Sequence, residues 1–409
     1  MRKKIKVNQL QPGMFVDELC GSWMDHPFWN TRFLVEDPAD VARLVASPVR
    51  ELWIDTARGI DVPEARTAQE IEARNEAALQ DLATRPAAPP RREAMDAEIA
   101  RAARICSRAR GAVMSMFKEA RMGRAVSGEQ LAPLVDEISS SVLRNPGALV
   151  SLARLKTKDD YTYLHSVAVC GLMISLGRQL GLPDSDTREI GLAGLVHDLG
   201  KAEIPDEILN KPGKLTDHEF DVIRGHPSAG HRMLIEGQGV GDIPLDVCLH
   251  HHEKIDGSGY PDRLSGDAIS LYAKMGAVCD VYDAITSNRA YKAGWSPAEA
   301  LRKMTEWSEG HFDRAVFQAF IKCVGIYPVG SLVRLESGLL AVVMDNQSEA
   351  LLTPTVKAFY CTRRKERIVP RVFDLARLSG KDKIRNWESP SNWPFRDLDE
   401  LWSGQPTRH

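Results

Sequence analysis

A helical repeat of apolar residues runs through the middle of this sequence and limits its fold more than any other feature. Apolar side chains recur every three or four residues over residues 94–143, and the pattern continues with interruptions, through stretches that include 190–199 and 218–235, to about residue 285. This spacing places the apolar side chains on one face of each helix. Glycines, prolines and the Asn-Lys-Pro-Gly segment at 210–213 mark helix ends. The centre of the chain is therefore predicted to be an all-α bundle.

The two ends of the chain have a different pattern. Residues 1–57 alternate short apolar runs with turn-forming segments, and short alternating runs return after Pro328, with a turn at 336–338. These patterns are typical of small strand-rich modules. We therefore predict a mainly α protein with five parts: a small strand-rich N-terminal module at 1–63, an Ala, Arg and Pro-rich linker at 64–95, connecting helices at 96–139, a helical domain at 140–325 and a short β-rich C-terminal extension at 326–409.

Charge and composition exclude several classes of partner. The net charge is only −3, so no general positive field exists that would bind duplex nucleic acid. The longest apolar runs, such as 339–344, are far shorter than the roughly 20 residues that a membrane span requires. The basic residues at 1–6 are not followed by the apolar stretch of a signal peptide, and the seven cysteines form no CxxC pairs. We expect a cytoplasmic protein without membrane insertion.

Histidine is concentrated in one part of the chain. Eight of the eleven histidines lie between residues 165 and 252. Imidazole and carboxylate groups are ligands for divalent metals, and separated helices can bring such groups together in the core of a bundle. The ligand types in and just after this part of the chain are His165, His197 with Asp198, His226, the triplet at 250–252 and the carboxylates of the segment Asp280-Val281-Tyr282-Asp283.

The spacing around Asp198 predicts how this site is arranged. On a helix, the adjacent side chains of His197 and Asp198 diverge by about 100° and approach one centre from two directions. A carboxylate in that position can bridge two ions. Lys201 follows His197 at the i+4 position, on the same helical face, where an ammonium group can neutralise charge on a phosphoryl oxygen. With His251, His252 and Asp280, these residues complete a two-ion cluster.

The other histidines are given a structural interpretation. Three consecutive helical side chains cannot all reach one centre, so we choose His251 and His252 over His250. Isolated histidines are more often surface or satisfied helix residues than ligands, and this applies to His26, His218, His231, His311 and His409. A helical bundle whose histidines bind no metal is the alternative for the whole group.

Two segments resemble the HD-GYP family of phosphodiesterases. Residues 197–201 are His-Asp-Leu-Gly-Lys, and residues 251–261 are His-His-Glu-Lys-Ile-Asp-Gly-Ser-Gly-Tyr-Pro. Together with further similarity at 161–166, 204–209, 211–216, 226–227 and 280–287, the resemblance covers nearly half of the chain. It implies an HD-superfamily helical bundle as the catalytic domain at 140–325. The implied reaction is hydrolysis of cyclic di-GMP to linear pGpG, and often onward to GMP.

The resemblance also implies a ligand set and a cofactor. Asp198 is implied as the bridging carboxylate, and Lys201 as a catalytic and substrate-binding residue beside it. Members with three ions have a glutamate four residues before the first histidine, whereas this chain has Tyr161. We therefore expect two divalent ions, iron or manganese, on seven ligands: His165, His197, Asp198, His226, His251, His252 and Asp280.

Substrate and partner residues follow from the same resemblance. Arg289 and Lys292 match the phosphate-binding residues of the family, although two basic residues at i and i+3 can also simply solvate a helix end. The loop formed by Gly259, Tyr260 and Pro261 is predicted to shape the base-binding surface or a partner surface, with Tyr260 contacting substrate. The resemblance implies diguanylate cyclases with GGDEF domains as partners. Residues 10–16 and 52–56 resemble a domain of unknown function that precedes some HD-GYP domains.

Two other functions stay open at this point. A catalytically weak receptor for cyclic di-GMP is compatible with the missing glutamate. Another HD-type hydrolase would act on a nucleoside triphosphate, on ppGpp or on a mixed cyclic dinucleotide. The Gly-Tyr-Pro segment argues against the first two of these substrates.

Overall fold

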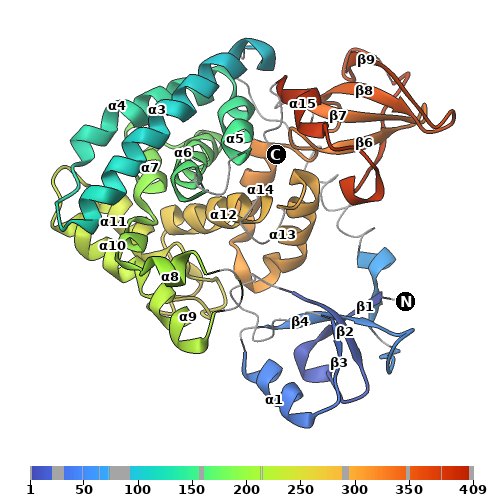
Figure 1. Cartoon of the computed structure of the whole chain (residues 1–409), viewed down its shortest axis with the longest axis horizontal. Coiled ribbons are helices and arrows are strands. Elements are labelled where there is room, and N and C mark those ends of the chain that lie inside the picture. Colours follow the sequence, from blue (N-terminus) through green and yellow to red (C-terminus); the bar gives the residue numbers. More distant parts are fainter. Residues whose placement is uncertain are drawn as a thin grey trace. The chain divides into compact units, whose positions relative to one another are not determined.

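The computed structural model describes the chain outside residues 1, 21–31, 48, 64, 72, 74–92, 156–160, 212, 214, 288–293, 347–350, 379 and 405–409, and outside the side chains of residues 46, 96 and 161. Figure 1 shows its helices and strands. The chain folds as two compact units. The first consists of residues 1–81 with 305–309, and the second of residues 82–304 with 310–409.

The first unit is built on a five-stranded antiparallel sheet in the order β3-β2-β4-β1-β5. Its helix α1 begins at Pro38, directly after Asp37, whose carboxylate accepts a hydrogen bond of 2.8 Å from the backbone N–H of Ala39. Such a cap satisfies a backbone donor that would otherwise lack a partner. The elements are β1 (Arg2–Lys6), η1 (Val7–Gln9), β2 (Phe15–Leu19), β3 (Phe33–Leu34), α1 (Pro38–Ala46), β4 (Glu51–Asp55) and β5 (Arg66–Thr67).

The core of this unit is aliphatic. Val16, Leu44, Leu52 and Ile54 are fully buried and belong to one cluster that joins the sheet to α1. Side chains along a strand alternate between the two faces of the sheet, so the apolar residues of these strands lie on one face. That face packs against α1. The predicted strand-rich N-terminal module is confirmed.

The second unit is mainly helical. Its longest helix is α3 (Met95–Arg121), and the following helices pack against it and against one another. The remaining helices are α4 (Gly128–Arg144), α5 (Pro146–Arg154), α6 (Tyr161–Gln179), α7 (Asp184–Val196), η4 (Leu199–Glu203), α8 (Asp206–Leu209), α9 (Asp217–Arg224), α10 (His226–Ile235), α11 (Asp242–His250), η5 (Gly266–Ala268), α12 (Leu271–Thr286), α13 (Pro297–His311) and α14 (Arg314–Val324).

Local sequence signals explain where several of these helices begin. Asn145 ends α4 and also caps α5, because its Oδ1 accepts hydrogen bonds from the backbone N–H groups of Gly147 (3.0 Å) and Ala148 (3.2 Å). Thr216 and Glu219 form a reciprocal capping box at the start of α9. A cap of this kind stabilises a helix by about 1 kcal/mol.

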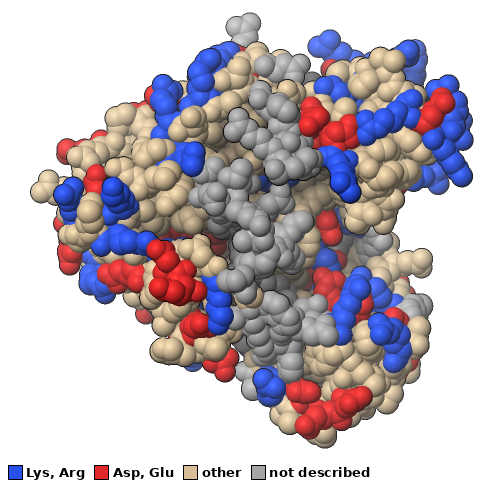
Figure 2. Space-filling model, in the orientation of Figure 1, with Lys and Arg blue, Asp and Glu red and all other residues tan. Residues whose placement is uncertain are grey.

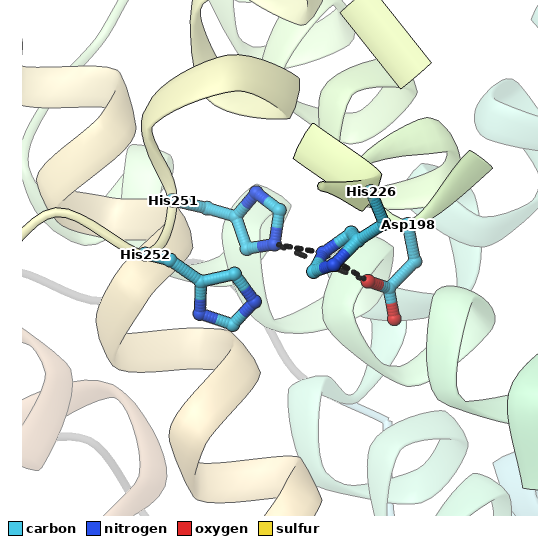
Figure 3. A group of neighbouring side chains, drawn as sticks. All are labelled: Asp198, His226, His251 and His252. Carbon is cyan, nitrogen blue, oxygen red and sulfur yellow. Dashed lines mark hydrogen bonds and ion pairs between the residues drawn. The ribbon is translucent and has the colours of Figure 1, made fainter. Parts of the chain in front are cut away.

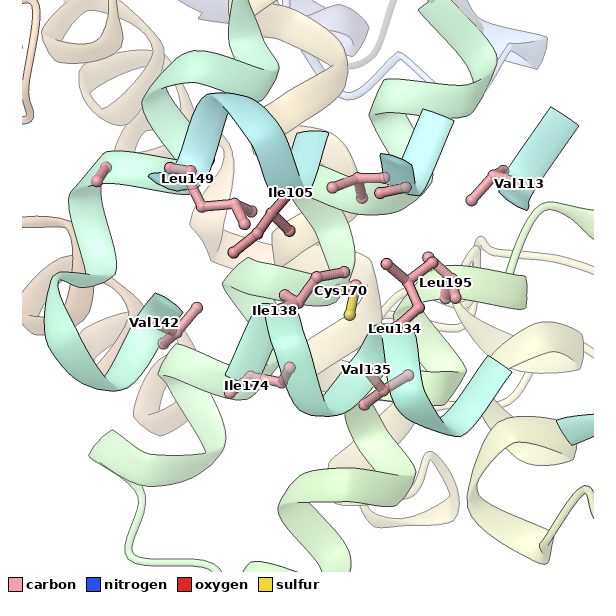
Figure 4. Close-up of a cluster of buried hydrophobic side chains, with 14 of the residues drawn as sticks. Ile105, Val113, Leu134, Val135, Ile138, Val142, Leu149, Cys170, Ile174 and Leu195 are labelled. Carbon is pink, nitrogen blue, oxygen red and sulfur yellow. The ribbon is translucent and has the colours of Figure 1, made fainter. Parts of the chain in front are cut away.

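One continuous core holds the helical bundle together. Figure 4 shows Ile105 of α3, Ile138 of α4 and Leu149 of α5 meeting Ile174 of α6 in this cluster. Ile138, Leu149 and Ile174 are fully buried. Truncating such a side chain to alanine costs about 2–5 kcal/mol, so these contacts stabilise the packing of the four helices. The predicted all-α centre is confirmed.

The structure corrects two details of the helical prediction. The periodic stretch from 218 to 235 is two helices, because the chain turns at Gly225 just before His226 and Pro227. The periodic stretch from 190 to 199 does not continue as an α-helix either. Helix α7 ends at Val196, and a short 3₁₀ helix, η4, begins at Leu199. Apolar periodicity cannot detect these breaks, since the residues on both sides of each break are buried.

The second unit ends in another five-stranded antiparallel sheet, in the order β10-β6-β7-β8-β9. Its buried side chains Leu340, Val342 and Phe359 belong to the same apolar cluster as the helices. The predicted β-rich extension is therefore confirmed. The elements are β6 (Leu332–Leu335), β7 (Leu339–Asp345), β8 (Thr355–Cys361), β9 (Glu366–Asp374), β10 (Ile384–Trp387), η6 (Pro390–Asn392) and α15 (Leu398–Ser403).

Basic side chains gather on this second sheet, as Figure 2 shows over β8 and β9. Arg363, Lys365 and Arg371 are exposed near or on β9, which is an edge strand and also contains Pro370. Charge and proline at an edge oppose pairing with a strand of another chain. In the part of the chain that the structure describes, no helix is both long enough and apolar enough to cross a membrane.

Candidate metal centre

The helical unit brings seven histidine and aspartate side chains together in two groups. One group contains His165, His197 and Asp280, and the other contains Asp198, His226, His251 and His252. Within each group, one potential ligand atom from every residue lies within 4.8 Å of the others. These are the seven residues that the sequence analysis selected. Figure 3 shows the side chains of the second group turned toward one another.

The first group is formed by three helices. His165 lies in α6, His197 directly follows α7, and Asp280 lies in α12. Nε2 of His165 is 3.0 Å from Oδ1 of Asp280 and 3.2 Å from Nε2 of His197. Ligand atoms that are each about 2.1 Å from one ion, at right angles, lie about 3 Å apart. The spacing in this group is therefore that of ligands around a common cation.

In three of these histidines Nδ1 is bound to a backbone carbonyl oxygen, and this fixes which nitrogen faces inward. Nδ1 of His197 donates to the carbonyl oxygen of Gly194 (2.9 Å), that of His226 to Ile223 (2.7 Å) and that of His251 to Val247 (3.0 Å). A carbonyl oxygen can only accept, so Nδ1 carries the proton in each case. In the neutral rings, Nε2 then presents a lone pair toward the centre, as metal-binding histidines do.

Asp198 lies between the two groups. Its Oδ2 is 3.4 Å from Nε2 of both His165 and His197, and its Oδ1 is 3.2 Å from Nε2 of His226 and 3.9 Å from Nε2 of His251. Oδ1 is buried and receives no hydrogen bond within the described residues. A His226 ring whose single proton lies on Nδ1 presents Nε2 to Oδ1 of Asp198 as a second acceptor. This arrangement is favourable only with a cation between them.

The pKa shifts of Asp198 and His251 match the protonation states that metal ligands need. Burial raises the pKa of Asp198, but the nearby Lys201 and His197 outweigh burial and hold that pKa well below its usual value of 3.8. Burial lowers the pKa of His251 to about 3, with smaller contributions from His197 and His226. Metal binding requires both states, a neutral imidazole and an ionised carboxylate.

His165 shows the strength of the negative field. Its burial lowers its pKa, yet hydrogen bonds with Asp198, Asp280 and Asp283 outweigh burial and raise the pKa to about 10. The pocket therefore attracts positive charge, whether a proton or a metal ion carries it.

Lys201 lies beside the shared carboxylate, in η4 rather than on an α-helix with His197. Its Nζ donates a hydrogen bond of 2.5 Å to Oδ2 of Asp198, three residues earlier. The helical argument for His197, Asp198 and Lys201 was therefore wrong in its geometry, because α7 ends before His197. The three side chains nevertheless converge, since the tight 3₁₀ turn brings residue i+3 over residue i.

A glycine makes the close approach of η4 and α10 possible. A Cβ atom at Gly200 would lie 1.9 Å from the carbonyl oxygen of His226 and 2.5 Å from the backbone nitrogen of Gly230. Only glycine fits this contact. The contact places Asp198 opposite His226 and so joins the two groups.

The Gly-Tyr-Pro loop folds back onto the histidine pair. A Cβ atom at Gly259 would lie 2.5 Å from Cα of Glu253, so the loop passes against that backbone. The backbone N–H of Tyr260 donates to the carbonyl oxygen of His252 (3.3 Å), and its ring stacks on the His252 ring with centroids 4.7 Å apart. Pro261 follows in a half-buried position.

Two buried carboxylates near the site are not among the ligands selected from the sequence. Oδ2 of Asp283 accepts a hydrogen bond from Nδ1 of His165 (2.7 Å), and Oε1 of Glu253 accepts one from the backbone N–H of Asp262 (2.8 Å). Asp283 orients His165, and Glu253 anchors the loop after Tyr260. The i, i+3 spacing of Asp280 and Asp283 on one helix was a signal that could have identified Asp283.

The other histidines that the structure describes are not part of the two groups. Nδ1 of His250 contacts Asp246 (2.7 Å) and its Nε2 contacts Asp262 (3.1 Å), so its ring points away from both groups. The two groups also do not include His218, His231 and His311. The predicted substrate residues Arg289 and Lys292, and also His26 and His409, lie outside the described residues.

Comparisons with known proteins match both parts of the chain. Residues 2–131 match a domain of unknown function, DUF3391, and residues 144–316 match the HD domain. The chain is 57% identical over 406 residues to "Cyclic di-GMP phosphodiesterase PA4108" of Pseudomonas aeruginosa, which covers 99% of this chain and 96% of the relative.

Two more distant relatives match less than half of the chain. The "Cyclic di-GMP phosphodiesterase response regulator RpfG" of Xanthomonas campestris is 39% identical over 208 residues, 49% of this chain and 53% of the relative. The "3'3'-cGAMP-specific phosphodiesterase 1" of Vibrio cholerae is 39% identical over 166 residues, 40% of this chain and 38% of the relative. The chain is thus similar to enzymes named for two different cyclic dinucleotides.

Proposed function

The chain belongs to the family of HD-domain cyclic di-GMP phosphodiesterases, and from this premise we propose that it hydrolyses cyclic di-GMP to pGpG at the two His and Asp groups. The single observation that carries the proposal is the position of Asp198, whose two carboxylate oxygens face different histidine groups. A carboxylate so placed suits two cations about 3.5–4 Å apart.

The ligand chemistry supports two divalent ions. His165, His197 and Asp280 would hold one ion, and His226, His251 and His252 the other, with Asp198 shared between them. Mixed imidazole and carboxylate ligands suit iron or manganese. When bound, such ions polarise phosphoryl oxygens and lower the pKa of water.

Hydrolysis forms a bond between a water oxygen and phosphorus and breaks the bond from phosphorus to the 3′ oxygen, which leaves with a proton. Lys201 lies at the edge of the centre with its side chain 22% exposed, so its ammonium group can reach a phosphoryl oxygen while it holds Asp198. A positive charge that already lies where negative charge develops in the transition state lowers the barrier of such a reaction. Tyr260, stacked on His252, would contact the nucleotide beside the centre. Arg289 and Lys292 are proposed as further phosphate-binding residues.

The proposal extends to a partner and a compartment. Tyr260 and Pro261 are only half-buried, which supports contact between this loop and a GGDEF-domain diguanylate cyclase. All seven cysteines are free thiols, which supports a reducing cytoplasm. Co-purification of a cyclase with the wild-type chain, but not with a Tyr260→Ala variant, is the expected result for the partner.

A chromatographic assay tests the substrate. Purified protein reconstituted with iron or manganese is incubated separately with cyclic di-GMP and with 3'3'-cGAMP. The proposal expects cyclic di-GMP to be converted to pGpG with the higher kcat/KM. Preference for 3'3'-cGAMP, or binding of cyclic di-GMP without turnover by the metal-loaded protein, contradicts it.

A further inference from the structure

Arg224 forms the end of a stack that reaches the metal centre. Its guanidinium carbon lies 4.9 Å from the centroid of the Tyr260 ring and 5.0 Å from that of Phe220, four residues earlier on α9. The Tyr260 ring in turn stacks on His252, with an interplanar angle of 24°. His252 faces His226 at a centroid distance of 5.0 Å. Arg224 is thus linked to the centre through two aromatic rings.

The charge of Arg224 is not matched by a carboxylate. Within the described residues, the structure gives Arg224 no ion pair, and its Nε atom is buried without a hydrogen bond. The neighbouring cations differ in this respect. Lys201 binds Asp198, Lys211 binds Glu219, and Arg232 binds Glu203. Aromatic packing holds the Arg224 guanidinium in place but uses none of its N–H groups in the ring plane.

We propose that Arg224 binds the phosphodiester group of cyclic di-GMP that is not being cleaved. This inference rests on the proposed function and adds a substrate-binding residue to it. A guanidinium group matches two phosphoryl oxygens with parallel N–H donors, and stacking on Tyr260 fixes its plane in advance. The buried Nε donor of Arg224 has no hydrogen-bond partner within the described residues, so an oxyanion can bind there without breaking a hydrogen bond of the protein.

The position of Arg224 determines which of the two phosphodiester groups of the substrate it can bind. A cyclic dinucleotide carries two phosphodiester groups in one ring, so when one lies at the His and Asp groups the other must lie to the side. The rings of Tyr260 and His252 lie between Arg224 and the His and Asp groups, so Arg224 lies beside the centre, where the second phosphodiester group would be. The same stack provides aromatic surface for the nucleotide between the two phosphates.

Three variants test the inference. Arg224→Met keeps an unbranched side chain for packing on the rings but removes the charge, and Arg224→Lys keeps the charge without the planar fork. Arg232→Met is the matched control, because Arg232 is exposed, lies on the adjacent α10 and pairs with Glu203. Each variant is assayed with cyclic di-GMP and with bis(p-nitrophenyl) phosphate, which has a single phosphodiester group. Metal content is measured for every preparation.

We expect Arg224→Met to lower kcat/KM for cyclic di-GMP about ten- to a hundredfold, mainly through KM, as loss of a charge-assisted hydrogen bond does. Hydrolysis of bis(p-nitrophenyl) phosphate and the metal content should stay within about twofold of wild type, because neither involves the second phosphate. Arg224→Lys should recover part of the loss, and Arg232→Met should match wild type. Equal losses with both substrates, or no loss with cyclic di-GMP, overturns the inference.

A binding assay separates phosphate recognition from base recognition. Cyclic di-GMP and cyclic di-AMP are measured as inhibitors of bis(p-nitrophenyl) phosphate hydrolysis. If Arg224 binds phosphate, Arg224→Met weakens both inhibitors by similar factors. Weakening of cyclic di-GMP alone means that Arg224 reads guanine, and the inference is wrong. This assay also works if cyclic di-GMP binds without being hydrolysed, so failure of the proposed function remains distinguishable.

Discussion

Nζ of Lys201 donates a hydrogen bond of 2.5 Å to Oδ2 of Asp198, the carboxylate that faces both histidine groups. The pair depends on the short 3₁₀ helix after α7, which places residue i+3 over residue i. Lys201 therefore helps to keep Asp198 ionised in a fully buried position and remains partly exposed at the edge of the centre.

Lys201→Met should lower kcat for cyclic di-GMP about a hundredfold, because the variant lacks the cation that would stabilise charge on the phosphoryl group. The metal content should change little, since Lys201 is not among the grouped ligands. Steady-state kinetics and elemental analysis measure the two quantities. Lys211→Met is the control, because Lys211 pairs with Glu219 instead. A Lys201 variant with wild-type kcat contradicts the assigned role.

Asp283→Asn should weaken metal binding about ten- to a hundredfold, because Asp283 orients His165 through the hydrogen bond to Nδ1. The amide has nearly the same shape, so the fold should be retained. Competition with a chelator measures the affinity, and circular dichroism checks the fold. Unchanged affinity in a folded Asp283→Asn protein would show that His165 needs no such support.

Gly200→Ala should destabilise the protein and separate the two groups, because the new Cβ would lie 1.9 Å from the carbonyl oxygen of His226. Gly111→Ala is the matched control. Gly111 lies within α3 with no atom within 4 Å of an added Cβ, and alanine there should stabilise the helix by up to about 1 kcal/mol. Thermal unfolding of the two variants should therefore shift in opposite directions. Equal Tm values would contradict the close packing of η4 on α10.

Glu98 should make stability depend on pH. It is fully buried and accepts hydrogen bonds from Ser141 (2.8 Å) and from Nε of Arg144 (2.7 Å). Burial raises its pKa, but these partners outweigh burial and lower it below the ordinary value of 4.5. The unfolded state thus binds the proton more readily, so the stabilisation is complete above pH 4.5 and is lost as pH falls through the folded pKa.

Glu98→Gln should accordingly remove that part of the pH dependence and cost about 3 kcal/mol at neutral pH, because it leaves Arg144 without its charged partner. Denaturant unfolding from pH 7 down to about pH 2 measures the effect, because the loss lies below pH 4.5. Glu137→Gln is the control, since Glu137 pairs with Arg108 on the surface, where such pairs contribute about 0–1 kcal/mol. Similar curves for the two variants would contradict the assignment to Glu98.

The residue types in the sequence were enough to select the candidate metal ligands. His165, His197, His226 and Asp280 could be selected because imidazole and carboxylate groups are unusual in apolar helices, and the structure brings them together. The choice of His251 over His250 also agrees with the geometry, because the two ring nitrogens of His250 contact Asp246 and Asp262 instead.

The sequence was less informative about local structure that depends on tertiary packing. Nothing in the residues after Val196 distinguishes an α-helix from a 3₁₀ turn, because the reason for the turn is the contact of Gly200 with α10. The contact of Arg224 with Tyr260 is another example. The two residues are 36 positions apart, and their packing depends on how the Gly-Tyr-Pro loop folds back. Contacts of this kind exist only in the folded chain.

Metal content measured together with cyclic di-GMP turnover, for wild type and Asp198→Ala, tests the central claim most directly. Asp206→Ala is the control, because Asp206 is an exposed carboxylate that pairs with Arg121. We predict about two ions per chain and production of pGpG for the wild type and the control, because one carboxylate serves two ions. Asp198→Ala should lose both metal and turnover. An Asp198→Ala protein that keeps its metal and its activity would contradict the account.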